Sequence, residues 1–83
     1  MRLAGKTAIV TGGASGFGAG IVRKFRAEGA EVMIADLNGA AAHDMAQATG
    51  SLAHETDVAK GESVAALAQS ALAAWGRIDI VVN

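Results

Sequence analysis

The stretch Thr11-Gly12-Gly13-Ala14-Ser15-Gly16-Phe17-Gly18 decides the fold of this sequence. It follows a β-branched run that is typical of a strand and opens a segment with helical periodicity. Gly12 permits a tight turn out of the strand, Gly16 lets a bound pyrophosphate approach the backbone, and Gly18 lets the helix lie close to the strand. The start of that helix offers free N–H groups and a positive dipole end to phosphates. The stretch therefore predicts a dinucleotide-binding loop. No Gly-Lys-Ser/Thr sequence ends it, so it is not a P-loop.

Short apolar runs and helical patterns alternate on both sides of this loop. Strands are predicted for residues 6–10, 31–35, 51–56 and 77–82, and helices for about 16–28, 39–49 and 60–75. The order β-α-β-α-β-α-β predicts an α/β fold with parallel strands and right-handed crossovers. We expect a Rossmann-type doubly wound parallel sheet of strand order 3-2-1-4, incomplete at the edge formed by the fourth strand.

The third helical segment shows how the core is expected to form. This segment carries an apolar stripe at helical spacing, which comprises Val64, Leu67, Ala68, Ala71, Leu72 and Trp75. Trp75 is expected to pack against the sheet as part of the core. Phe25 of the first helical segment is also expected to pack there. Ala59 stands at the expected cap position, so Glu62 is left as half of a capping box.

The composition excludes several classes of protein. With 7 Lys and Arg, 8 Asp and Glu, a net charge of −1 and 52% apolar residues, the chain is neither disordered nor a basic nucleic-acid binder. Its apolar runs are far shorter than the ~20 residues of a membrane span, and its N-terminus lacks the apolar segment of a secretory signal. With no Cys, disulfides and thiolate metal sites are excluded, which fits a cytoplasmic protein.

The remaining charged side chains and the histidines suggest no further site. His43 and His54 have no carboxylates at metal-binding spacing, so no metal is predicted and both are expected to be solvated. Arg23, Lys24 and Arg26 are interpreted as a solvated helix face.

Asp36 ends the second predicted strand, 18 residues after Gly18. A carboxylate at this position accepts hydrogen bonds from both ribose hydroxyls and repels a 2′-phosphate. Leu37 and Ser15 supply no basic side chain to balance such a phosphate, so NAD is favoured over NADP. The alternative is a helix cap, formed by Asp36 or Asn38.

Three motifs in the same order resemble the short-chain dehydrogenase/reductase family. They are Thr11-Gly12-x-x-x-Gly16-x-Gly18, Asp57-Val58 and the run Gly76 to Asn83. The resemblance covers the whole chain. It implies an NAD(P)-dependent oxidoreductase that acts on a small-molecule alcohol or ketone and assembles as a homo-oligomer, a tetramer or dimer. The cofactor-binding residues that follow from the loop and the resemblance are Gly12, Ser15, Gly16, Phe17, Gly18, Asp36, Leu37, Asp57, Val58 and Asn83.

The family also implies separate roles for some of these residues. Asp57 would recognise the adenine, and Asn83 would help to hold the sheet beside the adenosine. From the residues alone, alternative interpretations stay open. Asp57 is then a turn or capping residue, Asn83 a turn residue at the end of a strand, and Thr11 either a turn hydroxyl or a ligand. Phe17 departs from the family, which often has Ile there.

The catalytic Ser, Tyr and Lys of the family have no match here, because the sequence contains no Tyr and hence no Tyr-x-x-x-Lys. No catalytic residue is therefore predicted. Residues 1–83 are interpreted as the N-terminal part of a single NAD-binding Rossmann domain whose remainder is absent. The alternative is a non-catalytic NAD-binding or sensing module. A phosphoacceptor receiver domain is disfavoured, because the acidic pair that it needs after the first strand is missing.

Overall fold

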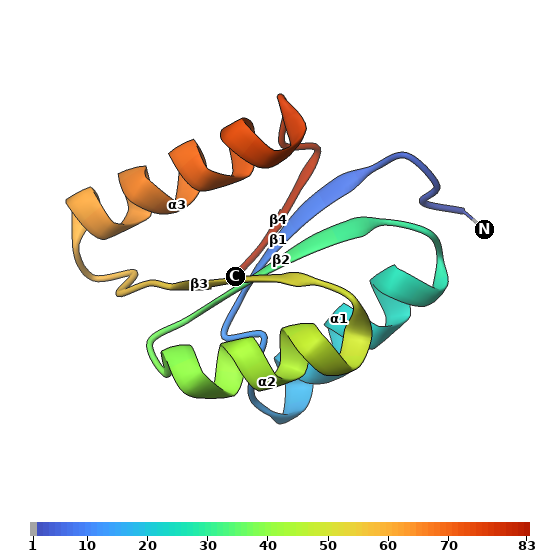
Figure 1. Cartoon of the computed structure of the whole chain (residues 1–83), viewed down its shortest axis with the longest axis horizontal. Coiled ribbons are helices and arrows are strands. Elements are labelled where there is room, and N and C mark those ends of the chain that lie inside the picture. Colours follow the sequence, from blue (N-terminus) through green and yellow to red (C-terminus); the bar gives the residue numbers. More distant parts are fainter. Residues whose placement is uncertain (1) are drawn as a thin grey trace.

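Four strands form one parallel sheet in the computed structural model, which describes residues 2–83 (Figure 1). The elements in chain order are β1 (Thr7–Thr11), α1 (Gly16–Ala27), β2 (Glu31–Asp36), α2 (Gly39–Thr49), β3 (Leu52–Glu55), α3 (Gly61–Trp75) and β4 (Ile80–Val82). The strand order is β3-β2-β1-β4, and every pair is parallel. The predicted α/β fold, element order and strand order are therefore confirmed.

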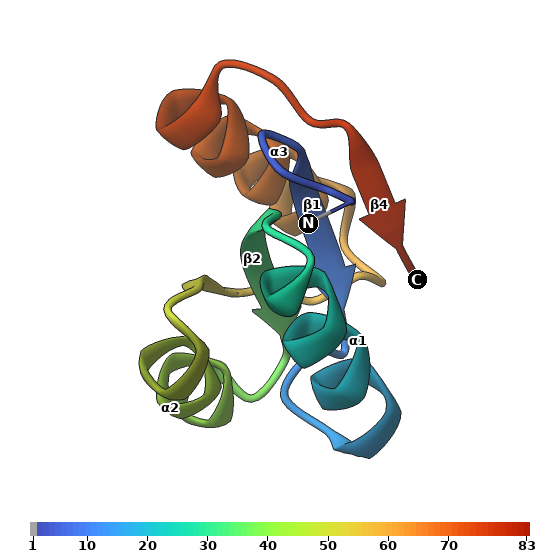
Figure 2. The ribbon, with the colours of Figure 1, turned by 90° about the vertical axis from the view of Figure 1, so that its right-hand side faces the viewer.

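Helices cover both faces of the sheet, with α1 and α2 on one face and α3 on the other (Figures 1 and 2). Successive strand residues point to opposite faces, so Val10 and Ile34 pack with α1 and α2, whereas Ile9 and Met33 pack with α3. Because both faces of β1 and β2 are covered, the interior residues of these strands, 8–10 and 32–35, are all apolar and buried. Phe25 is half-buried against the core on the α1 and α2 face, as predicted.

The apolar stripe of α3 is only partly covered. Leu67 and Ala71 are buried, and Trp75 is half-buried beside them. Val64 and Leu72 are 41% and 48% exposed, so these two residues of the stripe lie outside the core. The reason is the layer arrangement, because among residues 2–83 no other helix lies on this face of the sheet.

The start of α3 also differs from the prediction. Its N-cap is Lys60 rather than Ala59, and Lys60 makes no side-chain cap bond. Glu62 is therefore the second helical residue and not the third, so it cannot complete a capping box. The third position belongs to Ser63, whose Oγ accepts a hydrogen bond from the Asp57 N–H at 2.9 Å.

Two side chains predicted to be solvated make internal hydrogen bonds. Arg26 is half-buried, and its Nε and Nη1 donate to the carbonyls of Thr49 and Ala30 at 3.1 and 2.7 Å. It thereby joins the end of α1 to the end of α2. His54 is half-buried with Nδ1 2.7 Å from Thr56 Oγ1. His43 is exposed, as expected.

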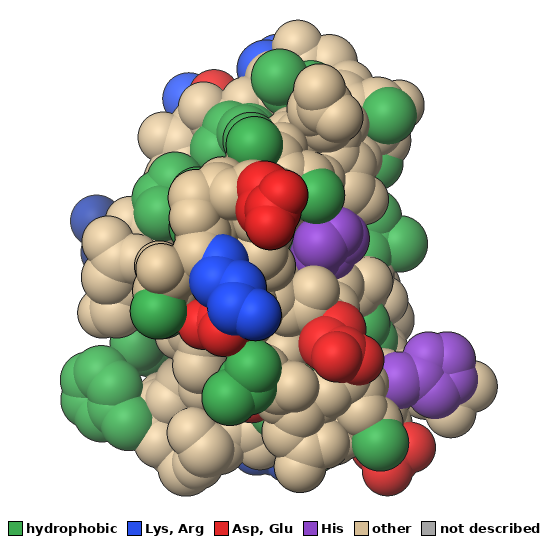
Figure 3. Space-filling view, turned by 90° about the vertical axis from the view of Figure 1, so that its left-hand side faces the viewer, with side chains coloured by type: hydrophobic (Ala, Val, Ile, Leu, Met, Phe, Trp, Pro, Cys, Tyr) green, Lys and Arg blue, Asp and Glu red, His purple; other side chains and the backbone are tan. Residues whose placement is uncertain are grey.

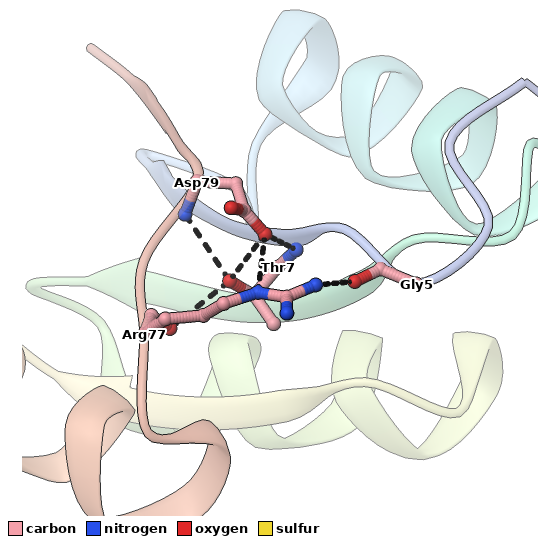
Figure 4. A network of polar contacts seen from close by, with 4 residues as sticks. All are labelled: Gly5, Thr7, Arg77 and Asp79. Atoms are coloured by element: carbon pink, nitrogen blue, oxygen red, sulfur yellow. Dashed lines mark hydrogen bonds and ion pairs between the residues drawn. The ribbon is translucent and has the colours of Figure 1, made fainter.

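The fourth strand is shorter than predicted, because Arg77 and Asp79 are used in a polar network with the start of β1 (Figure 4). The Thr7 N–H donates to Asp79 Oδ2 at 2.9 Å, and the Asp79 N–H donates to the Thr7 carbonyl at 3.0 Å. Arg77 Nε donates to the same Asp79 oxygen at 3.1 Å, and its Nη2 donates to the Gly5 carbonyl. This network fixes where β4 joins β1.

The same network predicts a pH-dependent contribution to stability. The hydrogen bond from the Thr7 backbone N–H, aided by the Arg77 guanidinium, holds the pKa of Asp79 below its ordinary value of 3.8. A lowered pKa means that the stabilisation is complete above 3.8 and disappears as the pH falls through the folded-state value. Replacing Asp79 with Asn should therefore lower the free energy of unfolding at neutral pH, and this difference should shrink in acid.

Urea denaturation over a pH series measures this difference. Arg77→Gln is the matched control, because it leaves the Thr7 N–H, the largest cause of the shift, in place. Most of the pH dependence should persist in that variant. A difference between the wild type and Asp79→Asn that is the same at neutral and acid pH would contradict the assignment.

Apolar side chains remain exposed on the α3 face and at β4, where Val81 is 56% exposed. Among residues 2–83, β4 pairs with β1 alone, which leaves one row of its backbone groups without a strand partner (Figure 2). Such an edge invites pairing with other chains.

We expect the 83-residue chain on its own to self-associate as its concentration rises, and we expect Val81→Lys to reduce this self-association. Light scattering measures the association, and a monodisperse monomer throughout would refute the expectation.

Candidate functional site

The carboxyl ends of β1, β2 and β3 meet at one end of the sheet, where they surround a cavity of about 310 Å³. In open parallel sheets, ligands bind at this end. The residues that line the cavity are Thr11, Gly12, Ala35, Asp36, Leu37, Thr56, Asp57 and Val58. Five of the predicted cofactor-binding residues are thus brought together, although they come from three separate loops. Another cavity, of about 400 Å³, lies by Phe25 and Glu28 and contains none of the predicted residues.

The three glycines of the loop have different surroundings. Gly12 has a φ of +68°, which a tight turn requires, and its N–H donates to the Ala35 carbonyl at 2.7 Å. A Cβ added to Gly18 would collide with the carbonyl of Gly12 and lie 2.8 Å from its carbon. A Cβ added to Gly16 would have no atom within 4 Å. Gly18 therefore serves close packing, whereas the backbone at Gly16 is open to an approaching group.

A fourth glycine was missed by the sequence analysis. Gly13 is buried, and an added Cβ would lie 2.9 Å from Ile34 Cγ2 and 3.3 Å from Val22 Cγ2. It lets β2 and α1 approach each other behind the loop. The signal available in the sequence was the second glycine that directly follows Gly12.

The start of α1 has no side-chain cap. Ser15 is the N-cap residue and its backbone is extended, but its Oγ donates to the Gly12 carbonyl at 3.2 Å and accepts no N–H of the helix. The first N–H groups of α1 are therefore available to an anion. Phe17 in this first turn is 87% exposed.

The Asp36 side chain is hydrogen-bonded to the loop after β1 and to the loop after β2. Its Oδ2 accepts the Ala14 N–H of the glycine loop at 3.2 Å, and its Oδ1 accepts the Asn38 N–H at 3.0 Å. Asn38 is the N-cap of α2, where its Oδ1 accepts the Ala41 N–H at 3.0 Å. Of the two residues that were candidates for this cap, Asn38 caps the helix, and the Asp36 carboxylate faces the glycine loop.

Asp57 and Val58 form the opposite wall of the cavity. The Asp57 side chain accepts the Ala59 N–H at 3.0 Å, and its carbonyl accepts the Lys60 N–H at 3.0 Å. Asp57 is therefore a turn residue in this structure, as one of its two interpretations required. Val58 is 63% exposed. Figure 3 shows this end of the molecule, where acidic side chains are spread among apolar ones and a basic side chain lies near the middle of the face.

Thr11 and Asn83 lie where β1 and β4 end side by side. The Thr11 Oγ1 donates to the Val82 carbonyl at 3.0 Å and lies 3.3 Å from Asn83 Oδ1. The Thr11 hydroxyl thus bonds across to β4, and the expectation of a bond within the glycine turn is wrong. Asn83 is not among the residues that line the first cavity. It lines a neighbouring apolar cavity of about 270 Å³ on the α3 face, together with Thr11, Val58 and Val81.

Among residues 2–83, no group of three His, Cys, Asp or Glu side chains is placed to hold a metal ion. No helix within these residues has the length and apolar character needed to cross a membrane.

Comparisons with known proteins give a consistent result. The family model described as short chain dehydrogenase matches residues 6–83. The chain is 45% identical to the D-threitol dehydrogenase of Mycolicibacterium smegmatis over 99% of its own length, and 44% identical to the 3-oxoacyl-[acyl-carrier-protein] reductase of Chlamydia muridarum over 98%. It spans 34% and 35% of these two relatives.

Solved structures agree with the fold. The 3-ketoacyl-(acyl-carrier-protein) reductase of Brucella melitensis, complexed with NADH, superposes with a TM-score of 0.93 at 40% identity, over 95% of this chain and 34% of that one. The hydroxysteroid dehydrogenase of Escherichia coli gives a TM-score of 0.96 at 34% identity, over 99% of this chain and 36% of that one.

Proposed function

This chain belongs to the short-chain dehydrogenase family, and on that premise we propose that it forms the NAD-binding part of an oxidoreductase. The bound nicotinamide would supply hydride transfer, either from the hydroxyl-bearing carbon of a small alcohol or to the carbonyl carbon of a ketone. The observation that carries the proposal is the cavity at the strand ends, with Asp36 between the glycine loop and the start of α2. A homo-oligomer and a cytoplasmic location stay predictions.

The residues around the cavity fit the parts of a dinucleotide. The N–H groups at the start of α1, which no side chain caps, and the open backbone at Gly16 would hold the pyrophosphate. The Asp36 carboxylate would accept hydrogen bonds from the ribose hydroxyls. The wall formed by Asp57 and the exposed Val58 would hold the adenine. We place Asn83 beside the adenosine, where it would support the sheet from β4.

The charges at the cavity support NAD over NADP. No Lys or Arg is among the residues that line it, whereas two carboxylates, of Asp36 and Asp57, are. Leu37 is 69% exposed and offers no positive charge. A 2′-phosphate would carry further negative charge into this site without a partner, which costs binding energy.

The test uses the complete enzyme that contains this chain. Calorimetric titration with NAD and NADP should show tighter binding of NAD, and a panel of alcohols should give NADH absorbance. Binding of NAD without turnover of any alcohol or ketone would favour a sensing module. Failure to bind either dinucleotide would refute the proposal.

A further inference from the structure

We infer that Asp36 is also a positioning residue, which holds the glycine loop in the shape that receives the cofactor. This inference rests on the proposed function, because it concerns how the same site is built. Through its bond to the Ala14 N–H, Asp36 would also shape the backbone that is proposed to hold the pyrophosphate.

The contacts of Asp36 join all three loops at the cavity. The side chain accepts the Ala14 N–H from the loop after β1 and the Asn38 N–H from the loop after β2. Its own carbonyl accepts the Thr56 N–H after β3 at 2.9 Å. One half-buried residue is thus bonded to each segment that lines the proposed cofactor site.

These bonds leave room for the ribose. An ionised carboxylate offers about four lone-pair sites. The two main-chain N–H groups use one site on each oxygen, so one on each oxygen is left. Two vicinal hydroxyls require two acceptor sites. Holding the loop and binding the diol are therefore simultaneous rather than competing tasks.

Asp57 provides a contrast within the same cavity. Its carboxylate accepts the Ala59 N–H, two residues away in its own turn. Among residues 2–83, no hydrogen bond joins the Asp57 side chain to the glycine loop or to the loop after β2. Of the two carboxylates that line the cavity, Asp36 is the one that connects separate loops.

A thermodynamic cycle between Asp36 and the ribose hydroxyls separates the two roles. The ligands are NAD and its analogue without the 2′- and 3′-hydroxyls on the adenosine ribose. The proteins are the complete enzyme and its Asp36→Ala variant. Loss of the hydroxyls should weaken binding to the wild type about 10- to 100-fold, since hydrogen bonds to charged groups are strong. The dideoxy ligand should still bind Asp36→Ala about 3- to 10-fold more weakly than the wild type.

Equal affinity of both proteins for the dideoxy ligand would overturn the positioning role and leave the proposed function intact. Hydrogen exchange at the Ala14 amide, without ligand, gives a second readout. The exchange should be faster in Asp36→Ala and, to a smaller extent, in Asp36→Asn, whose single side-chain oxygen replaces the two that accept the N–H groups of Ala14 and Asn38.

The matched control is Asp57→Asn, in which exchange at Ala14 should be unchanged because the Asp57 bond is local. Unchanged exchange in both Asp36 variants would refute the inference. If the wild type binds no NAD at all, the proposed function fails, and the Ala14 exchange still decides whether Asp36 holds the loop.

Discussion

The double substitution of Asp36→Ala and Leu37→Arg should weaken NAD binding and strengthen NADP binding, each by about one to two decades in affinity. A hydrogen bond to a charged group is worth about 1.5–3 kcal/mol, and each ~1.4 kcal/mol changes the affinity tenfold. The exchange removes the carboxylate that would accept the ribose diol and adds a guanidinium that can pair with a 2′-phosphate. Leu37 is 69% exposed, so an Arg side chain fits there without burial.

Steady-state kinetics of the complete enzyme with both cofactors measure the change in kcat/KM. Leu37→Arg alone is the informative control. It keeps the bond from Ala14 to Asp36, so NAD binding should change little in that variant. Because Asp36→Ala also loosens the glycine loop, NADP should gain less than NAD loses in the double variant. Equal use of NAD and NADP by the wild type would show that Asp36 does not select between them.

The sequence predicted the fold well where local pattern and tertiary structure require the same residues. The apolar runs of β1 and β2 were predicted as strands because burial on both faces of a parallel sheet demands such runs. Gly12 and Gly18 were assigned correctly, since the positive φ of one and the close packing of the other exclude side chains. The cavity at the strand ends follows from the parallel topology itself.

The sequence did not predict contacts between residues far apart in the chain. The bond from the Thr7 N–H to Asp79 joins positions 72 residues apart, and the bond from Ala14 to Asp36 joins positions 22 apart. Both use a backbone N–H, which every residue except Pro has, so residue identity gives no signal. The partial exposure of the α3 stripe was not predicted for a different reason. Periodicity shows which side of a helix is apolar, but not how much of that side a neighbour covers.

Gly18→Val should destabilise the fold with or without cofactor, whereas Gly16→Val should remove cofactor binding and spare the fold. A side chain at Gly18 meets the backbone of Gly12 and Gly13, which cannot move aside as a flexible side chain would. Overpacking of this kind typically lowers the free energy of unfolding by about 1–3 kcal/mol, and occasionally by more. At Gly16 an added Cβ meets nothing within 4 Å, so the free energy of unfolding should change by only about 0.5 kcal/mol.

Thermal unfolding of the complete enzyme with and without NAD separates the two effects. A ligand present at about 100 times its Kd stabilises the folded state by about 2.7 kcal/mol. That increment should vanish in Gly16→Val, because the side chain occupies the space through which the pyrophosphate would approach the backbone. Gly18→Val should instead unfold at a lower temperature in the absence of NAD. Gly20→Val is a matched control in the same helix, since an added Cβ there also has no atom within 4 Å. Gly20→Val should keep the stabilisation by NAD. If Gly20→Val lost that stabilisation too, the effect of Gly16→Val would come from a change in the helix and not from the cofactor site.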